Sequence, residues 1–467
     1  MKLPILLAAL PLAPVLALHA VEPAAKPNII VILADDLGYA DTGIYGGNKN
    51  KQTPRIDGLA QGGARFLNGY VSGPVCSPTR AGLLTGRYQQ RFGFEANGEG
   101  GKTPQEDIQR SMDKGQTTFP QRMKALGYAT GMIGKWHLGE PEGYRPIDRG
   151  FDEFFGIYPY GVDRGKNIPS GQLPAPLYRG TEEVPTPANF MNAFADESLA
   201  FLERHRGRPF FLYLPFTAIH GKQVGAEPWL GRTDPSLPMP QRKRIADIAQ
   251  LDEIVGRILD KLRELGLEEN TLIFFLSDNG AGTEQDNHPF RGTKWTLWDG
   301  GIHVPFVASW KGRFPAGQVL AQPVIQLDIL PTALAAAGQP AGPEDKLDGV
   351  NFLPLLEGKT TAAPHQALFW RFGIQSAVRQ GDWKLTQVEP EQPPRLYDLE
   401  KDPGESRDLA AENPAKVAEL QKLWDKWNQG NVAPRWIDPR WDIRVAKSKE
   451  EAQAKAKAQG ATKPGEK

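Results

Sequence analysis

The sequence predicts an α/β protein with a large, mostly parallel sheet between helices, followed by a smaller antiparallel sheet and a helix. Continuous apolar runs of strand length alternate with longer amphipathic stretches, and polar residues follow the runs. The chain of 467 residues also holds 50 glycines and 41 prolines, which favour shaped loops over a helix bundle or coiled coil. Because 40% of the residues are apolar, the chain can bury a large core and global disorder is excluded.

Buried strands and helices alternate in the first part of the chain. The apolar, β-branched or aromatic runs cover residues 28–34, 129–133, 210–216 and 271–276. The amphipathic stretches before the last three runs cover residues 119–126, 190–205 and 244–265. This alternation is typical of βαβ units, in which parallel strands are buried on both faces.

Polar residues gather just after these four runs. They are Asp35 and Asp36, then Lys135 and His137, then His220, then Asp278 and Asn279. The carboxyl ends of parallel strands meet at one edge of a sheet, and open α/β sheets bind ligands at that edge. We therefore expect a polar site there.

The composition changes after about residue 356. Short runs separated by turn residues predict four strands and a helix, at residues 367–372, 376–378, 383–386, 396–399 and 414–429. We place a catalytic domain at 21–360 and a C-terminal subdomain at 361–445. The Ala- and Lys-rich tail, 446–467, has too few large apolar residues to pack, so we expect it to be disordered.

The first 20 residues are typical of an export signal. Lys2 precedes an apolar run at residues 3–18, and Ala20 ends a plausible cleavage site. The run is short for a membrane span, so we expect an exported protein, periplasmic or secreted. Lys+Arg and Asp+Glu each number 55, so the basic excess of a nucleic-acid-binding protein is missing.

Cys76 is the chain's one cysteine, which excludes an internal disulfide. Ser77 and Pro78 are typical of a helix cap and first turn, so we expect Cys76 just before a helix N-terminus that favours anions. Arg80 would lie in the first turn. Taken alone, the pattern favours a small buried cysteine beside a capped helix.

The surrounding motifs change this interpretation. Cys76-Ser77-Pro78-Thr79-Arg80 has the form Cys-x-Pro-x-Arg, and Leu84-Thr85-Gly86-Arg87 extends it. Further matches occur at 127–130, 134–139, 278–280 and 396–399. Through these motifs the chain resembles the type I sulfatases of the alkaline phosphatase superfamily, from about residue 27 to about residue 427.

The resemblance implies that Cys76 is oxidised to formylglycine (3-oxoalanine) by a formylglycine-generating enzyme. Hydration of this aldehyde gives a diol. It also implies a metal held by residue 76 with Asp35, Asp36, Asp278 and Asn279. An all-oxygen set favours calcium over magnesium and disfavours zinc. Each acidic pair alone also fits a turn or helix cap.

The resemblance further implies the catalytic groups. Arg80, Lys135 and Lys294 would offset the charge of the sulfate ester, and we also expect Lys135, His220 and Lys294 to contact substrate. We expect His220 to protonate the departing sugar oxygen. His137 would take a proton from the second hydroxyl of the diol, so that sulfate is expelled. Without the resemblance, two loop lysines and two structural histidines would explain these residues.

The resemblance also implies a substrate class: exported sulfatases of this length commonly act on sulfated polysaccharides, so we expect an exo-acting carbohydrate sulfatase. Aromatic and polar residues that could contact a sugar are Tyr158, Tyr160, Asp163, Trp295, Trp298, Asp299 and His303. The family often has arginine near position 303, so His303 marks either a different sugar contact or no contact at all. Core packing is the alternative for the aromatic residues.

Two other functions stay open at this point. The same superfamily includes phosphodiesterases and phosphonate monoester hydrolases, some of which also use formylglycine. A sulfatase homologue that binds sugar without catalysis is the second alternative.

Overall fold

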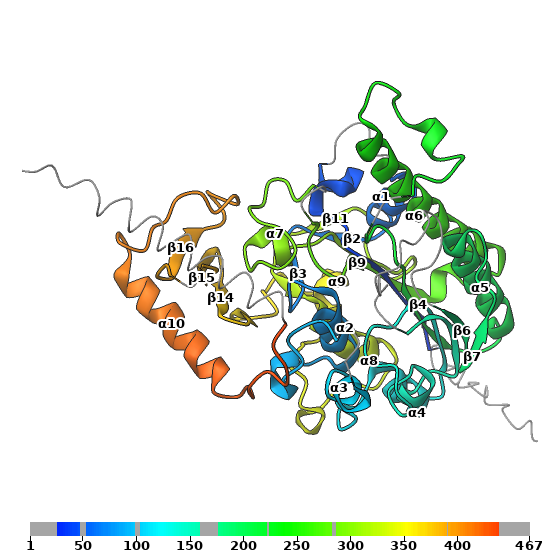
Figure 1. Ribbon diagram of the computed structural model, residues 1–467, viewed down its shortest axis with the longest axis horizontal. Helices are drawn as coiled ribbons and strands as arrows, with labels where there is room; N and C mark the ends of the chain where they lie inside the picture. Colours follow the sequence, from blue (N-terminus) through cyan, green and yellow to red (C-terminus); the bar gives the residue numbers. More distant parts are fainter. Residues whose placement is uncertain are drawn as a thin grey trace, which may run out of the picture.

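A ten-stranded mixed sheet forms the centre of the computed structural model, which describes residues 26–46, 53–98, 103–158, 176–221, 224–282, 286–389 and 391–438 (Figure 1). The strand order is β11-β2-β10-β9-β1-β8-β4-β5-β6-β7. The predicted export signal at 1–20, the tail at 446–467, and Tyr160 and Asp163 lie outside the described residues.

The middle of this sheet is the predicted set of parallel strands. These are β1 (Asn28–Ala34), β4 (Ala129–Lys135), β8 (Phe210–Pro215) and β9 (Thr271–Ser277). β1 pairs in parallel with both β8 and β9, and β4 pairs in parallel with β8. Every residue of these four strands is buried, as expected for strands covered on both faces.

Shorter strands extend the sheet on both sides. On one side lie β5 (Glu153–Ile157), β6 (Leu177–Arg179) and β7 (Glu182–Val184). On the other lie β10 (Phe306–Ser309), β2 (Ala64–Phe66) and β11 (Gln318–Leu320). β10 runs antiparallel to β9, and β6 antiparallel to β5, so the sheet is mixed. A separate pair joins β3 (Gly69–Tyr70) to β12 (Val324–Ile325).

Two groups of helices cover the two faces of the sheet. Ile30 and Ile32 of β1 pack into one core with α1 (Pro54–Gln61), α5 (Phe190–His205) and α6 (Met239–Glu264). Ile29, Val31 and Leu33 enter the other core, with α2 (Cys76–Thr85), α4 (Phe119–Ala125) and α8 (Ile329–Ala336). Alternate residues of one strand therefore supply both cores, as the two-residue period of a strand requires. The shorter helices are α3 (Pro104–Gln109), α7 (Asp299–Ile302) and α9 (Leu353–Leu356).

The predicted C-terminal sheet is present and antiparallel. Its strands are β13 (Leu368–Phe372), β14 (Gln375–Gln380), β15 (Trp383–Gln387) and β16 (Arg395–Asp398), and α10 (Pro414–Asn428) covers them (Figure 1). Trp370 and Phe372 belong to the same apolar core as α2 and α8. Trp370 also donates its indole N–H to the Val71 carbonyl at 2.7 Å. The small sheet therefore packs against β3 and shares a core with the helices on one face of the large sheet.

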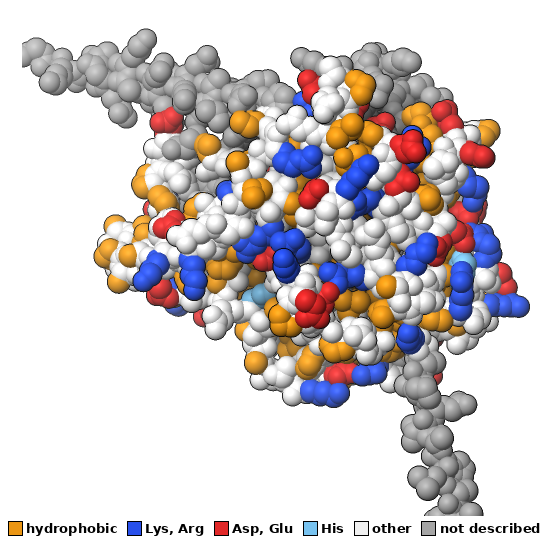
Figure 2. All heavy atoms as spheres, turned by 90° about the horizontal axis from the view of Figure 1, so that it is seen from below, with side chains coloured by type: hydrophobic (Ala, Val, Ile, Leu, Met, Phe, Trp, Pro, Cys, Tyr) orange, Lys and Arg blue, Asp and Glu red, His pale blue; other side chains and the backbone are white. Residues whose placement is uncertain are grey.

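The charge balance of the sequence also holds locally on the surface. On the face in Figure 2, cationic and anionic side chains lie beside one another among scattered apolar groups. Within the described ranges, every helix is too short or too polar to cross a bilayer.

α6 also caps α1 with a buried carboxylate. The carboxylate of Asp252 on α6 accepts the backbone N–H groups of Arg55 and Ile56, at 3.0 and 2.8 Å. These donors at a helix N-terminus have no partner within their own helix. Burial, with a smaller effect of Asp57, raises the pKa of Asp252 to about 6.

The pKa of Asp252 predicts a pH dependence of stability. Between about pH 4 and pH 6 the folded chain holds this proton more firmly than the unfolded chain, so the contribution of Asp252 to stability falls as the pH rises. Asp252→Asn cannot titrate. The free energy of unfolding of this variant, measured in urea relative to that of wild type, should therefore increase by on the order of 2 kcal/mol as the pH rises through that window. If the free energies of unfolding of both proteins change in parallel with pH, the raised pKa of Asp252 is contradicted.

Candidate active site

Four strand ends deliver the predicted polar residues to one edge of the sheet. Asp35 and Asp36 follow β1, and Asp278 and Asn279 follow β9, whose last residue pairs with Ala34. The backbone N–H of Asp278 donates to the Ala34 carbonyl at 3.0 Å. The parallel register therefore sets the two acidic pairs side by side.

The other two strands bring the basic residues. Lys135 is the last residue of β4, and His137 follows two residues later. The backbone N–H of Asp35 donates to Ala218, in the segment between β8 and His220, at 2.8 Å. Gly134 lets β4 approach this edge, because its φ is 132° and a β-carbon there would lie 2.1 Å from the Pro215 carbonyl oxygen.

Cys76 lies at the start of α2 and is fully buried. Its thiol donates to Asp35 Oδ1 at 3.4 Å and accepts from Lys294 Nζ at 3.2 Å. The expected cap at Ser77 is wrong: Val75 is the N-cap residue, Cys76 is the first helical residue, and Ser77 Oγ has no hydrogen-bond partner among the described residues. The extended backbone of Val75 turns the chain into the helix two residues earlier than the Ser-Pro pattern indicates.

Arg80 and Lys135 neutralise two of the carboxylates. Arg80 donates through Nε and Nη2 to Asp278 Oδ2, at 3.1 and 2.7 Å, and its Nη2 lies 3.4 Å from Asp35. Lys135 Nζ donates to Asp35 Oδ2 at 2.6 Å. Arg80 also donates to the Lys135 carbonyl at 2.8 Å, so the two cations hold each other in place. The side chains of all four residues are almost completely buried.

Asp36 is the centre of a second set of contacts. Lys294 Nζ donates to both of its carboxylate oxygens at 2.7 and 2.9 Å, and Asn279 Nδ2 donates to Oδ1 at 2.7 Å. His220 Nε2 lies 3.7 Å from Asp36 Oδ2. The structure thus brings Lys294 to Cys76, although the two are 218 residues apart in the sequence.

Burial dominates the protonation of this site. It raises the pKa of the Cys76 thiol well above its usual value, and Asp278 and Asp35 raise it further, so the sulfur stays a thiol. Burial lowers the pKa of His220 to about 4 and that of His137 well below its usual value. Both imidazoles are therefore neutral near pH 7 unless an anion other than the carboxylates of the site lies beside them.

Backbone strain also concentrates here. Asp36, His137 and Trp295 have positive φ angles of 64°, 61° and 78°. Such values are uncommon for residues with a side chain, and they persist only where the surrounding structure holds them. Each of the three lies next to or within the cluster of charged residues.

The cluster offers a place for a divalent cation. One ligand atom each from Asp35, Asp36, Cys76 and His220 lies within 4.8 Å of the others. Asn279 Oδ1 is buried without a hydrogen-bond partner in the described part of the chain, which leaves an amide oxygen available to a cation. Carboxylate and amide oxygens suit a hard cation, whereas the thiol does not. His220 lies within this group, although the sequence predicted a catalytic acid and substrate contact at this position and not a metal ligand.

Of the other expected substrate contacts, Trp295 directly follows Lys294 and Tyr158 lines a small pocket with His137, whereas His303 and Trp298 are held by other partners. Both ring nitrogens of His303 are engaged, with Asp299 at 3.1 Å and the Leu67 carbonyl at 2.8 Å, and the ring stacks on Phe290. Its position gives no support to a sugar contact. Tyr158 donates to the Gly180 carbonyl at 2.7 Å, and Trp298 is buried beneath Arg291.

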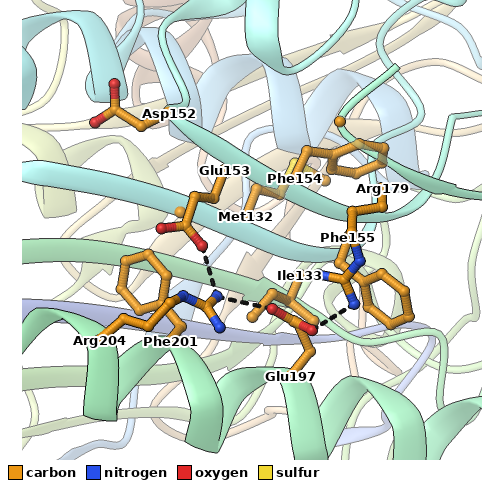
Figure 3. A pocket seen from close by; sticks show the side chains of 12 residues that line it. Met132, Ile133, Asp152, Glu153, Phe154, Phe155, Arg179, Glu197, Phe201 and Arg204 are labelled. Atoms are coloured by element: carbon orange, nitrogen blue, oxygen red, sulfur yellow. Dashed lines mark hydrogen bonds and ion pairs between the residues drawn. The ribbon is translucent and has the colours of Figure 1, made fainter. Parts of the chain in front are cut away.

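A cavity of about 320 Å³ lies elsewhere, between β5 and α5 (Figure 3). Four of its charged side chains pair with one another: Arg204 with Glu153 and Glu197, and Arg179 with Glu197, while Asp152 pairs with Lys124 outside the cavity. None of the predicted site residues lines it.

Two contributors to the site carried no sequence signal. Asn97 Oδ1 accepts the backbone N–H of Ser77 at 3.1 Å and so fixes the first turn of α2. Gln375, on β14, binds the backbone just after Lys294. Both act across long sequence separations, where local pattern carries no information.

Comparison with known proteins assigns the chain to a protein family. Residues 27–339 match the sulfatase family model, and residues 290–431 match the model for the C-terminal part of N-sulphoglucosamine sulphohydrolase. The chain belongs to the sulfatase family. Members of this family use formylglycine and a divalent metal, and the cluster around Cys76 has side chains that suit both.

The relatives of this sulfatase cover most of its length. The N-acetylgalactosamine-6-sulfatase of Canis lupus familiaris is 34% identical over 449 residues, covering 85% of this chain and 84% of the relative. Arylsulfatase A of Homo sapiens is 35% identical over 465 residues, covering 86% and 87%. The crystal structure of Ps i-CgsB in complex with k-i-k-neocarrahexaose has a TM-score of 0.81 at 29% identity, covering 91% and 97%. This sulfatase is a sulfuric ester hydrolase.

Proposed function

We propose that this sulfatase removes sulfate from carbohydrates, with residue 76 as formylglycine and a calcium ion held by Asp35, Asp36, Asp278, Asn279 and residue 76. The observation that carries the proposal is the position of the lone cysteine. A buried thiol that stays protonated, among three carboxylates and three cations, is both a weak nucleophile and a poor ligand for a hard cation. Conversion to a hydrated aldehyde removes this mismatch.

The charge balance of the cluster supports an anionic substrate. Asp35, Asp36 and Asp278 are matched by Arg80, Lys135 and Lys294, each within ion-pair distance of a carboxylate. When bound, a divalent cation would supply two further positive charges beside residue 76. A sulfate ester carries a single negative charge that moves onto the leaving oxygen, so this excess favours the transition state.

The chain's own residues have distinct proposed tasks. Arg80 and Lys135 hold Asp278 and Asp35, and Lys294 lies between Asp36 and residue 76, where its ammonium can meet a sulfate oxygen. An ester anion beside His220 favours the imidazolium and raises its pKa from about 4, so His220 is placed to protonate the leaving oxygen. His137 is neutral, so its imidazole can act as the general base that takes the proton of the second hydroxyl at residue 76.

Relatives and sequence support the remaining parts of the proposal. The names N-acetylgalactosamine-6-sulfatase and the neocarrahexaose complex favour a sulfated sugar as substrate, and we keep exo action as the working assignment. The apolar run at residues 3–18 supports export, periplasmic or secreted, after removal of 1–20. Maturation then requires a formylglycine-generating enzyme. We also keep 21–360 as the catalytic domain and 361–445 as the C-terminal subdomain.

Peptide mass spectrometry and activity together test residue 76. In active protein, the peptide with residue 76 should be about 18 Da lighter than the thiol form, because oxidation of the CH2–SH group to an aldehyde replaces sulfur by oxygen and removes two hydrogens. Cys76→Ala should abolish hydrolysis of an aryl sulfate. The same assay on Ser77→Ala is the control, because Ser77 Oγ makes no hydrogen bond within the described ranges. An active protein with an unmodified thiol would refute the proposal.

Leaving-group dependence tests His220. A sugar alkoxide needs a proton to leave, whereas an acidic phenolate does not, so His220→Ala should lower kcat/KM for sugar sulfates about 100-fold or more and for nitrophenyl sulfate far less. His205→Ala is the control, because His205 pairs with Glu153 away from the cluster. Equal losses on both substrates would reject His220 as the acid.

A further inference from the structure

The segment that carries Lys294 has backbone anchors on the side of the large sheet. The backbone N–H of Lys294 donates to the Ala281 carbonyl, and that of Trp295 donates to Pro74, each at 2.9 Å. Trp295 adopts a positive φ of 78°, so the chain turns sharply just after Lys294. A strained turn keeps its shape only if its far side is also held.

Gln375, on β14 of the C-terminal sheet, anchors the other side of this turn through hydrogen bonds. Its Nε2 donates to the Trp295 carbonyl and its Oε1 accepts from the Leu297 N–H, both at 2.8 Å. The side chain is only 3% exposed. One amide group thus satisfies a backbone acceptor and a backbone donor two residues apart, which fixes the path of the segment immediately after Lys294.

A buried ionic group fixes the end of the same segment. Lys384 on β15 donates to the Leu297 carbonyl at 2.8 Å and to Asp299 Oδ1 at 2.6 Å, and lies 2.8 Å from Glu405. Glu405 in turn accepts the backbone N–H of Asp299 at 2.7 Å. Buried ion pairs add little net stability, because desolvation offsets their attraction. Their effect here is to fix geometry.

We propose that Gln375 is a positioning residue for Lys294. By holding the turn at Trp295, it keeps Lys294 Nζ at 2.7 Å from Asp36 and 3.2 Å from the sulfur of Cys76. The inference rests on the proposed catalytic role of Lys294. It makes the C-terminal sheet part of the catalytic apparatus, acting through the backbone of one loop.

A double-mutant cycle with Lys294→Ala tests this. Gln375→Met keeps the length of the side chain and removes both hydrogen bonds, and should lower kcat/KM about tenfold or more, mainly through kcat. In the Lys294→Ala background the same change should cost less than about twofold, because the group being positioned is gone. Gln387→Met is the matched control: Gln387 lies on β15 and donates to the Gln392 carbonyl, away from Lys294, so both backgrounds should be unaffected.

The outcomes separate the two proposals. If Gln375→Met lowers kcat/KM by the same factor in wild type and in Lys294→Ala, or lowers it in neither, the positioning role of Gln375 is overturned. The proposed catalytic role of Lys294 is unaffected by that result. Full activity of Lys294→Ala alone would instead overturn the proposed role of Lys294. If Gln375→Met fails to fold by near-ultraviolet circular dichroism, Gln375→Glu decides by the same criterion, because it keeps the acceptor for Leu297 and loses the donor to Trp295.

Discussion

The burial of three carboxylates at one edge of a sheet is the constraint on which this structure depends. Asp35, Asp36 and Asp278 are almost inaccessible to solvent. An isolated buried charge costs several kcal/mol, so each carboxylate must be compensated within the fold. Arg80, Lys135 and Lys294 provide that compensation from three separate segments. Folding of the central sheet and assembly of the site are therefore the same event.

The cluster also explains why an unmodified cysteine side chain is poorly suited to this position. Lowering the pKa of a thiol requires a nearby excess of positive charge, but here Asp35 and Asp278 lie beside the sulfur as well. An oxygen at this position could share a hard cation with the carboxylates, whereas a neutral thiol cannot. The maturation proposed for residue 76 would therefore complete a site that the encoded cysteine leaves chemically mismatched.

Much of the fold and most of the cluster followed from the sequence because both depend on local pattern. Each of the four apolar runs forms a buried strand within two residues of its predicted bounds, and the residues after them meet at one edge because the strands are parallel. The three-residue strands β2, β6, β7 and β11 escaped prediction, since three residues carry too little periodicity. α6 begins five residues before the predicted start, with Pro240 accommodated in its first turn.

Long-range contacts set the limits of that prediction. Gln375 and Asn97 act through hydrogen bonds to backbone groups that are 20 or more residues away, which no local motif records. For His303, the arginine that the family often has near this position suggested a different sugar contact, but Asp299 and Leu67 occupy both ring nitrogens. The role of a polar residue depends on whether its partners are already inside the fold.

Calcium binding to matured, chelator-treated enzyme tests the central claim most directly. Isothermal titration calorimetry should detect a single Ca²⁺ per chain, and Asp36→Asn should weaken it by about tenfold or more, because one anionic ligand is lost. Asp260→Asn, which alters exposed ion pairs with Arg55 and Arg263, should bind as wild type does. Equal Ca²⁺ affinity in wild type and Asp36→Asn, or no stoichiometric binding to the wild-type enzyme, would contradict the account.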